Sequence, residues 1–541
     1  MIRNVLEYLE ASAQKYPDKT AVADDKNAMT YSQLHLAAYN IAADLIEYTD
    51  CRQPVLVYMG KSCNTLAAFM GIVIAGCFYV CLDTSQPQER INAIIKRLNP
   101  KIIITDKKLK DKCETFQFAG EILVIQAMLE KDTRFEYSEI FEKNKIFKEN
   151  EISDAGKALY ETSEKTRKLY ILNRIRQEAI DTDPLYAIFT SGSTGEPKGV
   201  VVNHRSVIDF IGHFADIFNI TKDDVIGNQA PFDFDISVKD IYSALKCGGT
   251  IQIIPKQLFS FPAKLLDYIE EKKVTTLIWA VSALCIVSAL KGFEYKVPAC
   301  INKVIFSGEV MPVRYLKEWQ STYPQAVFAN VYGPTEITCN CTYYIVDREF
   351  AEDENIPIGS AFPNERVFLL DTHDRLIESD KCGEKGEICV SGTAVSLGYY
   401  NNQGLTDEAF VQNPLNTFYN ELIYRTGDLG YYNKNSQLCF YGRKDSQIKH
   451  NGYRIELAEI EKAVSLLDGI SLAACIFSKA NDKIICYYQG QADEKSIVSY
   501  LLKKIPKYMI PNQFIQIELM PITKNGKLDR AELLRKYQHT L

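Results

Sequence analysis

Helix-like and strand-like segments alternate along most of this chain, a pattern typical of α/β layers. Strand-like apolar runs at residues 55–58, 101–105 and 122–125 each follow a helical stretch. The chain has 541 residues, whereas a single hydrophobic core rarely grows beyond about 250–300 residues. We therefore expect a mixed α/β (α+β) fold divided into at least two domains.

Composition and charge exclude several classes of protein. A hydrophobic fraction of 46% with 24% charged residues is ordinary for a folded, soluble chain. The net charge of −7 comes without a basic stripe, which argues against nucleic-acid binding. The longest apolar stretch, residues 67–82, is shorter than the roughly 20 residues of a membrane span, so we expect no membrane partner.

The N-terminus and the cysteines indicate a compartment. A helical pattern begins near Asn4, where a secretory signal would need an uninterrupted apolar core. The 15 cysteines include no C-x-x-C pair, and no histidine stands at zinc spacing from a cysteine pair. We interpret them as reduced thiols that fill the core, and the expected location is the cytoplasm.

Two composition changes suggest how the chain is organised. Between residues 129 and 168, 19 of 40 residues are charged, which indicates a solvated helical insertion or, alternatively, a docking surface. A second change lies near residues 441–443, after which a helix is expected over residues 456–467. We predict a large N-terminal domain of several α/β subdomains at 1–441 and a small, mobile C-terminal α+β domain at 442–541.

A loop rich in glycine and hydroxyl groups is the most informative segment. It lies between the apolar strand 186–189 and a second strand at 200–202. Its residues are Thr190, Ser191, Gly192, Ser193, Thr194, Gly195, Glu196, Pro197, Lys198 and Gly199. Glycines let the backbone approach phosphate oxygens, hydroxyls donate hydrogen bonds, and lysine supplies charge. The Gly-Lys-Ser/Thr ending of a Walker A loop is missing, and a plain surface turn would be the alternative.

Three further motifs accompany this loop: Tyr332-Gly333-Pro334-Thr335-Glu336, Tyr424-Arg425-Thr426-Gly427-Asp428 and Asn525-Gly526-Lys527-Leu528-Asp529-Arg530. Together the four resemble those of the adenylate-forming superfamily, which includes acyl-CoA synthetases, luciferases and the adenylation domains of nonribosomal peptide synthesis. Within it, residues 228–232, 308–312 and 442–449 are similar to stand-alone amino-acid adenylation enzymes of the D-alanine–carrier protein ligase type.

The resemblance implies ATP and Mg²⁺ as cofactors and a role for each motif. The 190–199 loop, including Thr190 and Lys198, would hold the β- and γ-phosphates, and Glu336 would bind Mg²⁺. Tyr332, beside Gly333, would stack on adenine, Thr335 would contact the α-phosphate, and Asp428 would accept both ribose hydroxyls. Lys527 would stabilise the charge of the transition state, with Lys524 as the competing lysine. Arg443 joins the nucleotide set, and Asp445 marks the hinge of the C-terminal domain.

The segment 232–239 aligns with the start of the family's acid-binding pocket. Asp235 stands where amino-acid-activating members keep a carboxylate for the α-ammonium group, although it could simply cap the following helix. The remaining aligned lining positions are Ile236, Lys239, Trp279, Ile305, Ser307, Val331, Cys339 and Asn340. We expect Trp279 to shorten the pocket, and Lys239, Ser307 and Asn340 to make it polar.

These positions favour a small or polar α-amino acid, acidic ones included. Ser307 replaces a cysteine of the D-alanine enzymes, and Lys239 takes an apolar position, or could turn outward to pair with Asp240 or Glu309. The predicted activity is formation of an aminoacyl adenylate followed by transfer to phosphopantetheine. Because no Gly-Gly-x-Ser segment follows Arg530, the expected acceptor is a separate carrier protein. An acyl- or aryl-CoA ligase and a non-catalytic nucleotide-binding member are the alternatives.

Overall fold

The structure of the protein is a computed structural model that describes residues 2–130, 135–140, 163–192, 196–445, 447–478, 480–521 and 528–540. It divides into two compact units. The first contains Met1–Thr84, Leu98–Ile188 and Val200–Tyr441, and the second contains Ser85–Arg97, Phe189–Gly199 and Gly442–Leu541. The domain boundary at residue 441 and the hinge at Asp445 stay predictions.

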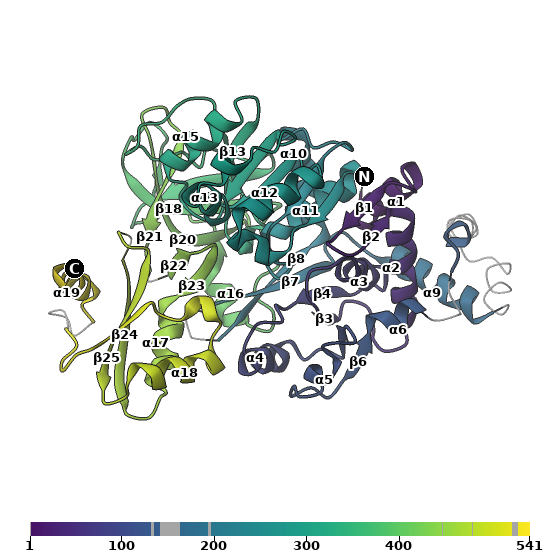
Figure 1. Cartoon of the computed structure of the whole chain (residues 1–541), viewed down its shortest axis with the longest axis horizontal. Helices are drawn as coiled ribbons and strands as arrows, with labels where there is room; N and C mark the ends of the chain where they lie inside the picture. Colours follow the sequence, from purple (N-terminus) through teal and green to yellow (C-terminus); the bar gives the residue numbers. More distant parts are fainter. Residues whose placement is uncertain are drawn as a thin grey trace. The chain divides into compact units, whose positions relative to one another are not determined.

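Two largely parallel sheets build most of the first unit (Figure 1). The nine-stranded sheet has the order β15-β14-β13-β12-β11-β9-β10-β1-β2, in which only the pairs made by β14 and β2 are antiparallel. Its strands are β1 (Thr20–Ala23), β2 (Ala28–Thr30), β9 (Val225–Asn228), β10 (Thr250–Ile253), β11 (Thr276–Ala280), β12 (Lys303–Ser307), β13 (Val327–Tyr332), β14 (Thr342–Ile345) and β15 (Ser360–Ala361).

The six-stranded sheet has the order β6-β5-β3-β4-β7-β8, and its pairs from β6 to β7 are parallel. Its strands are β3 (Pro54–Tyr58), β4 (Phe78–Cys81), β5 (Ile102–Thr105), β6 (Glu121–Val124), β7 (Pro184–Thr190) and β8 (Lys198–Asn203). Every residue of β3, β4 and β5 is buried, as expected for parallel strands covered on both faces.

A third sheet in the first unit is antiparallel and has the order β17-β16-β18-β20-β19, with β21 also paired to β20. Its strands are β16 (Glu365–Leu370), β17 (Leu376–Ile377), β18 (Lys385–Gly392), β19 (Phe410–Gln412), β20 (Leu422–Tyr432) and β21 (Leu438–Arg443). The register shifts between Glu387 and Cys389, opposite the segment that carries Asp428.

Helices connect and cover these strands, and several begin at side-chain caps. Thr30 and Gln33 form a capping box at α2, and Ser62 and Asn203 cap α3 and α10. The helices are α1 (Leu6–Lys15), α2 (Tyr31–Leu45), α3 (Cys63–Ile74), α5 (Lys110–Cys113), α6 (Ile125–Glu130), α9 (Glu164–Glu178), α10 (His204–Ile217), α11 (Ile236–Cys247), α12 (Pro262–Glu271), α13 (Val281–Ala289), α14 (Gly292–Tyr295), α15 (Val313–Thr322) and α16 (Gln403–Ala409). The short 3₁₀ helices are η1 (Lys256–Ser260) and η2 (Thr335–Ile337).

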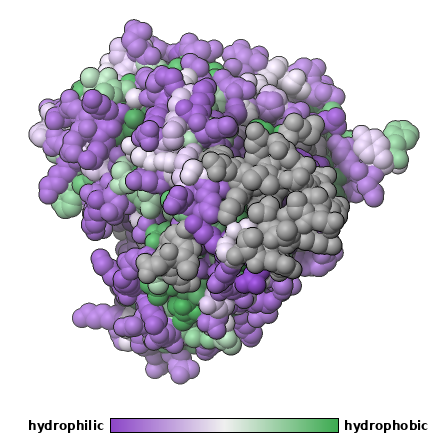
Figure 2. Space-filling model, turned by 90° about the vertical axis from the view of Figure 1, so that its right-hand side faces the viewer, coloured by the Kyte–Doolittle hydropathy of each residue, from purple (hydrophilic) through white to green (hydrophobic). Residues whose placement is uncertain are grey.

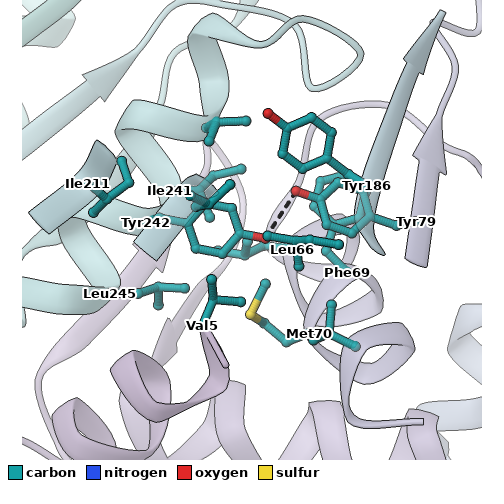
Figure 3. Packing of buried hydrophobic residues seen from close by; sticks show 14 of the residues in the cluster. Val5, Leu66, Phe69, Met70, Tyr79, Tyr186, Ile211, Ile241, Tyr242 and Leu245 are labelled. Carbon is teal, nitrogen blue, oxygen red and sulfur yellow. Dashed lines mark hydrogen bonds between the residues drawn. The ribbon is translucent and has the colours of Figure 1, made fainter. Parts of the chain in front are cut away.

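The main core of the first unit joins both parallel sheets. Figure 3 shows side chains from α3, α10 and α11 packed with Tyr79 and Tyr186, which stand on neighbouring strands β4 and β7. The hydroxyls of Tyr79 and Tyr242 lie 3.0 Å apart in a hydrogen bond. This bond satisfies two buried hydroxyls that would otherwise be costly to desolvate, and it ties α11 to the six-stranded sheet.

The second unit contains two small sheets, β22-β23 and β24-β25-β26. Its elements are α4 (Gln88–Leu98), β22 (Gln447–His450), β23 (Tyr453–Glu456), α17 (Leu457–Ser465), β24 (Ile470–Ser478), β25 (Lys483–Gly490), α18 (Glu494–Lys504), η3 (Lys507–Met509), β26 (Gln513–Gln516) and α19 (Arg530–Thr540). Arg90 of α4 forms a buried ion pair with Glu459 of α17. A buried charge is tolerated when an opposite charge answers it.

These elements confirm the predicted α/β fold class and the strands expected at 55–58, 101–105 and 122–125, the last shifted by one residue. Within the charged 129–168 segment, residues 131–134 and 141–162 lie outside the described residues, and α9 begins at Glu164. All 15 cysteines are free, and ten of them are buried, in agreement with a core-filling role.

The coloured part of the surface in Figure 2 is largely polar. The face in Figure 2 is covered mainly by hydrophilic residues. In the part of the chain that the structure describes, every helix is too short or too polar to cross a membrane.

Candidate active site

The Tyr332–Glu336 motif forms a tight turn at the end of β13. Thr338 and Cys339 adopt left-handed backbone angles, with φ of 50° and 74°, and the amide of Cys341 returns to the carbonyl of Tyr332 at 2.8 Å. A Cβ on Gly333 would lie 2.5 Å from the Cα of Asn340. Only glycine allows this close approach of two backbone segments, so the turn fixes the directions of Tyr332 and Glu336.

Tyr332 in this turn is hydrogen-bonded to Asp428 of β20. The Tyr332 hydroxyl donates to Asp428 Oδ2 at 2.6 Å, and both side chains are buried. Burial, together with the Asp428 charge, holds the pKa of Tyr332 well above its usual range. The tyrosine therefore remains a donor, and it orients a carboxylate that can accept further hydrogen bonds.

Glu336 lies in the same turn and is fully buried. The Tyr399 hydroxyl donates to Glu336 Oε1 at 2.8 Å, and the Ser396 amide donates to the Glu336 carbonyl oxygen at 3.0 Å. Among the described residues there is no cluster of three or more acidic, histidine or cysteine side chains that could hold a metal alone. A single carboxylate fits Mg²⁺, which takes one or two carboxylates and completes its shell with phosphate and water oxygens.

The glycine-rich loop belongs to the second unit, where it leaves β7 at Thr190 and enters β8 at Lys198. The Thr190 hydroxyl is buried and has no hydrogen-bond partner in the described chain, whereas Ser191 donates to the Arg454 carbonyl at 2.9 Å. A Cβ on Gly192 would lie 2.1 Å from the Glu196 carbonyl oxygen. Ser193, Thr194 and Gly195 lie outside the described residues.

The other predicted site residues of the second unit are described in part. Arg443 donates twice to the Asp445 carboxylate, with both nitrogen–oxygen distances at 2.7 Å. Burial alone would raise the pKa of Asp445, but the Arg443 hydrogen bonds and charge hold it below its usual value. The expected hinge residue is thus paired with the expected nucleotide-binding arginine. Lys524 and Lys527 lie outside the described residues.

Asp235 immediately precedes α11, at the N-cap position, but its side chain does not cap the helix. Its backbone is helical, with φ of −63° and ψ of −24°, and its side chain makes no capping hydrogen bond. The alternative interpretation, that this carboxylate serves only to start the helix, is therefore wrong. The thiol of Cys339 donates to the Asp235 carbonyl oxygen at 2.9 Å, which connects α11 to the turn that follows β13.

Lys239 lies one turn further along α11 and is fully buried. Its Nζ donates to Asn340 Oδ1 at 2.7 Å and to Ser307 Oγ at 3.3 Å. Burial lowers the pKa of Lys239, while the charges of Cys339, Asp235 and Asp240 oppose that shift. The outward conformation considered from the sequence is wrong. We call Asp235, Lys239, Ser307, Cys339 and Asn340 the α11 polar cluster.

The structure corrects the position of Trp279. Side chains alternate between the two faces of a strand, and Trp279 lies opposite Phe306 on the face that packs with α12 and α13. Its ring contacts Phe259 edge to face, and its indole Nε1 donates to the Gly227 carbonyl oxygen at 2.7 Å. The expectation that Trp279 shortens the substrate pocket is therefore wrong.

Two neighbours of Trp279 lie on the face of the polar cluster instead. Ile278 pairs in register with Ile305, and Ala280 pairs with Ser307. Ile278, Ile305 and Val331 belong to the main core together with residues of α11, and Ile236 packs with Ala280. The two-residue period of β11 could have identified Ile278 and Ala280 from the sequence, because they share a parity that Trp279 lacks.

Two other groups were missed by sequence reasoning. Tyr399, which holds Glu336, comes from a loop 63 residues away in the chain, and no motif marks it. Tyr186 was assigned to an apolar strand, yet its pKa is held well above its usual range by burial and by the nearby charges of Cys339 and Asp235. Its hydroxyl points away from the Tyr79–Tyr242 hydrogen bond (Figure 3).

Comparison with known proteins identifies the class. Residues 9–400 match the sequence model of the AMP-binding enzyme family. The chain belongs to this family of adenylate-forming, ATP-dependent ligases, as its motifs predicted.

Three individual proteins show how similar the chain is to members of this family. The chain is 31% identical to a D-alanine–D-alanyl carrier protein ligase of Staphylococcus haemolyticus, with 98% of each chain aligned. It is 27% identical to tyrocidine synthase 1 of Brevibacillus parabrevis, of which it spans only 45%. Among solved structures, an adenylation domain of Vibrio cholerae in complex with glycyl-adenosine-5′-phosphate has a TM-score of 0.81 at 20% identity, over 100% of this chain and 98% of that one. At that identity, the structural likeness shows the fold alone.

Proposed function

We propose that this ligase activates an α-amino acid and transfers it to a carrier protein. In the first step a substrate carboxylate oxygen attacks the α-phosphorus of ATP, and the bond to the β-phosphate breaks to release pyrophosphate. In the second, the phosphopantetheine thiol of the carrier loses its proton, its sulfur attacks the acyl carbon, and AMP leaves. The aligned likeness to the D-alanine–D-alanyl carrier protein ligase supports this choice of acceptor.

The observation that most supports an amino-acid substrate is Asp235. Its carboxylate stands at the head of α11 without the capping hydrogen bond that would explain an aspartate there. A partly buried carboxylate favours a ligand that carries a positive charge. An α-ammonium group supplies that charge, whereas an aryl or fatty acid does not.

The nucleotide roles follow from the chemistry of the described groups. Asp428, oriented by Tyr332, would accept the ribose hydroxyls. Glu336, oriented by Tyr399, would hold Mg²⁺, and Mg²⁺ would neutralise phosphate charge. The buried Thr190 hydroxyl is suited to a phosphate oxygen. Lys527 would stabilise the negative charge that develops during adenylation, and Arg443 and Asp445 would form the joint about which the C-terminal domain turns.

Exchange of radiolabelled pyrophosphate into ATP tests the first step. The panel contains the proteinogenic amino acids, their D-forms, and the matching α-hydroxy acids. We expect exchange with at least one amino acid and a preference of roughly 100-fold or more over its hydroxy analogue, since the analogue leaves Asp235 without a cation. Asp235→Asn should remove most of that preference, and Asp223→Asn, at an exposed site paired with Lys222, should leave it unchanged.

Each other result of this panel contradicts the proposal. Exchange with acids that lack an amine, followed by transfer to coenzyme A, would identify an acyl- or aryl-CoA ligase. Failure of every acid, with ATP still bound, would identify a non-catalytic nucleotide-binding protein.

A further inference from the structure

The α11 polar cluster contains a buried cation whose hydrogen bonds to described residues all go to neutral groups. Lys239 is fully buried, and its two acceptors are the amide oxygen of Asn340 and the hydroxyl of Ser307. Buried lysines are rare unless they are paired, because removing an ammonium from water is expensive. The charges of Asp235 and Asp240 oppose the effect of burial on Lys239, but both hydrogen bonds that Nζ makes among the described residues go to neutral oxygens. A ligand carboxylate would supply a direct, charged hydrogen-bond partner.

We propose that the substrate is an α-amino acid whose side chain ends in a carboxylate, and that Lys239 is the specificity-determining residue that binds this carboxylate. The inference rests on the proposed function, because it requires Asp235 to receive the α-ammonium group.

The hydrogen-bonding capacity of Lys239 fits this role. An ammonium group has three N–H donors. Two of them are directed at Asn340 and Ser307, and one is left for a ligand. The two neutral acceptors hold Nζ in place without cancelling its charge, so the third donor is presented in a fixed position. A pre-positioned donor loses little entropy when the ligand binds.

The spacing of Asp235 and Lys239 fits the same substrate. The residues are four positions apart, and the backbone of Asp235 is already helical. Such residues lie on one face of a helix with Cβ atoms about 5–6 Å apart. One carboxylate and one ammonium at this separation match, in reversed sign, the α-ammonium and the side-chain carboxylate of an acidic amino acid.

The neighbouring aspartate is already engaged elsewhere. Asp240 is fully buried, and its Oδ2 accepts a hydrogen bond from Asn228 at 2.6 Å. Burial raises the pKa of Asp240 to about 7, against the opposing effects of Asn228, Lys239 and Lys61. Lys61 in turn donates to Asn228 Oδ1 and to the carbonyl oxygens of residues 228–230. Asp240 thus belongs to a hydrogen-bond network with Asn228, at the end of β9, and Lys61. It makes no hydrogen bond to Lys239.

The corrected position of Trp279 removes an objection to this substrate. A tryptophan at the end of the pocket would admit only the smallest side chains, but that ring packs on the opposite face of the sheet. The side chains of the cluster's own face are Ile278, Ala280 and Ile305, together with Ser307. An aliphatic wall that ends in a lysine suits an aliphatic chain that ends in a carboxylate.

Pyrophosphate exchange with isosteric pairs tests the proposal. Wild-type protein is assayed with aspartate against asparagine and glutamate against glutamine, in both enantiomeric forms. We expect one acid to exceed its amide by about 100-fold or more in kcat/KM, since the amide leaves the buried cation unanswered. Lys239→Met should lower kcat/KM for the acid by roughly 10²- to 10³-fold. The kcat/KM for the corresponding amide should stay the same or rise. Lys246→Met, on the same helix but paired with exposed Asp216, is the matched control.

The outcomes separate the two proposals. Exchange that favours a neutral or basic amino acid overturns the acidic-substrate inference and leaves amino-acid adenylation standing. No exchange with any amino acid overturns the proposed function. If Lys239→Met does not fold, Lys239→Gln replaces it in the exchange assay. In addition, the binding of glutamyl- or aspartyl-sulfamoyl-adenosine to the wild-type protein is compared, by competition, with the binding of the matching amide compound. Equal binding of acid and amide compounds would also overturn the inference.

Discussion

The two faces of strands β11 and β12 differ sharply although they alternate residue by residue. One face carries Trp279, Val304 and Phe306, which pack into an apolar cluster with α12, α13 and α15. The other carries Ile278, Ile305 and Ser307, and it meets α11 with its buried Lys239. The same strands therefore supply stability on one side and, in our proposal, substrate selection on the other.

This difference separates two kinds of burial. On the apolar face, every side chain removed from water adds to stability at about 25 cal/mol per Å². On the α11 face, burying Lys239 costs free energy that no described carboxylate hydrogen bond returns. Proteins retain such unfavourable burial mainly at functional sites. We therefore place the substrate on the polar face.

The largest expected effect separates the two faces directly. Trp279→Ala should lower the free energy of unfolding by about 3–5 kcal/mol, because it leaves a large cavity in the apolar cluster. It should leave the ranking of substrates in pyrophosphate exchange unchanged. Ile278→Ala, one position earlier, should lower the free energy of unfolding by about 2–5 kcal/mol. It should also shift the substrate preference towards amino acids with bulkier side chains. Denaturant unfolding and the exchange panel on both variants measure this, and a change of ranking in Trp279→Ala alone would reverse the assignment of faces.

The next effect concerns the charges of α11. Burial raises the folded-state pKa of Asp240 from its ordinary value of 3.8 to about 7. Between about pH 4 and pH 7 the folded state holds a proton that the unfolded chain has lost, so stability falls as the pH rises through this window. We expect this contribution to be roughly 2–4 kcal/mol. Asp240→Asn should remove it, which urea unfolding at several pH values will measure.

A control variant for this pH dependence is available on α10. Asp216→Asn changes an exposed aspartate that pairs with Lys246, and it should keep the wild-type dependence. Should Asp240→Asn retain that dependence as well, another buried group would be responsible.

A smaller effect is expected at the turn formed by residues 332–336. Tyr332→Phe removes the hydroxyl that donates to Asp428, and a hydrogen bond to a charged group contributes about 1.5–3 kcal/mol. We predict a rise of about tenfold or more in KM for ATP, with a lesser change in kcat, since the tyrosine positions the carboxylate and takes no part in the reaction. Tyr344→Phe removes a comparable bond, to Asp347 at 2.7 Å, and should leave KM for ATP at the wild-type value.

The smallest effect is expected at Ser307. Its hydroxyl makes the longer of the two hydrogen bonds to Lys239, at 3.3 Å. Ser307→Ala should therefore weaken the binding of the acidic substrate by only about 0.5–1.5 kcal/mol. We expect a loss of roughly three- to tenfold in kcat/KM for the preferred acid. Ser288→Ala removes a buried hydroxyl of α13 that has no hydrogen-bond partner among the described residues, and it should have no effect on specificity. Unchanged kcat/KM in Ser307→Ala would show that Asn340 alone holds the lysine.

Sequence reasoning recovered the fold class because it depends on local signals, and the motif at residues 332–336 does form a local turn. Residues 332–336 are contiguous, and the strands around them are short apolar runs between helical segments. The assignment of Trp279 failed because it was aligned one residue away from Ile278, and on a strand that shift moves a side chain to the other face. The family resemblance placed Lys239, Ser307 and Asn340 in one pocket, but it did not predict the hydrogen bonds between them. Ser307 and Asn340 are 68 and 101 residues away from Lys239, and only the tertiary fold brings them together.

A crystal structure with glutamyl- or aspartyl-sulfamoyl-adenosine bound tests the central claim most directly. The account predicts the Asp235 carboxylate within about 3 Å of the ligand's α-ammonium nitrogen, and Lys239 Nζ at about 2.7–2.9 Å from its side-chain carboxylate. Lys239 should keep its hydrogen bonds to Asn340 and Ser307. A ligand whose side-chain carboxylate points to solvent, with Lys239 bonded only to those two neutral groups, would contradict it.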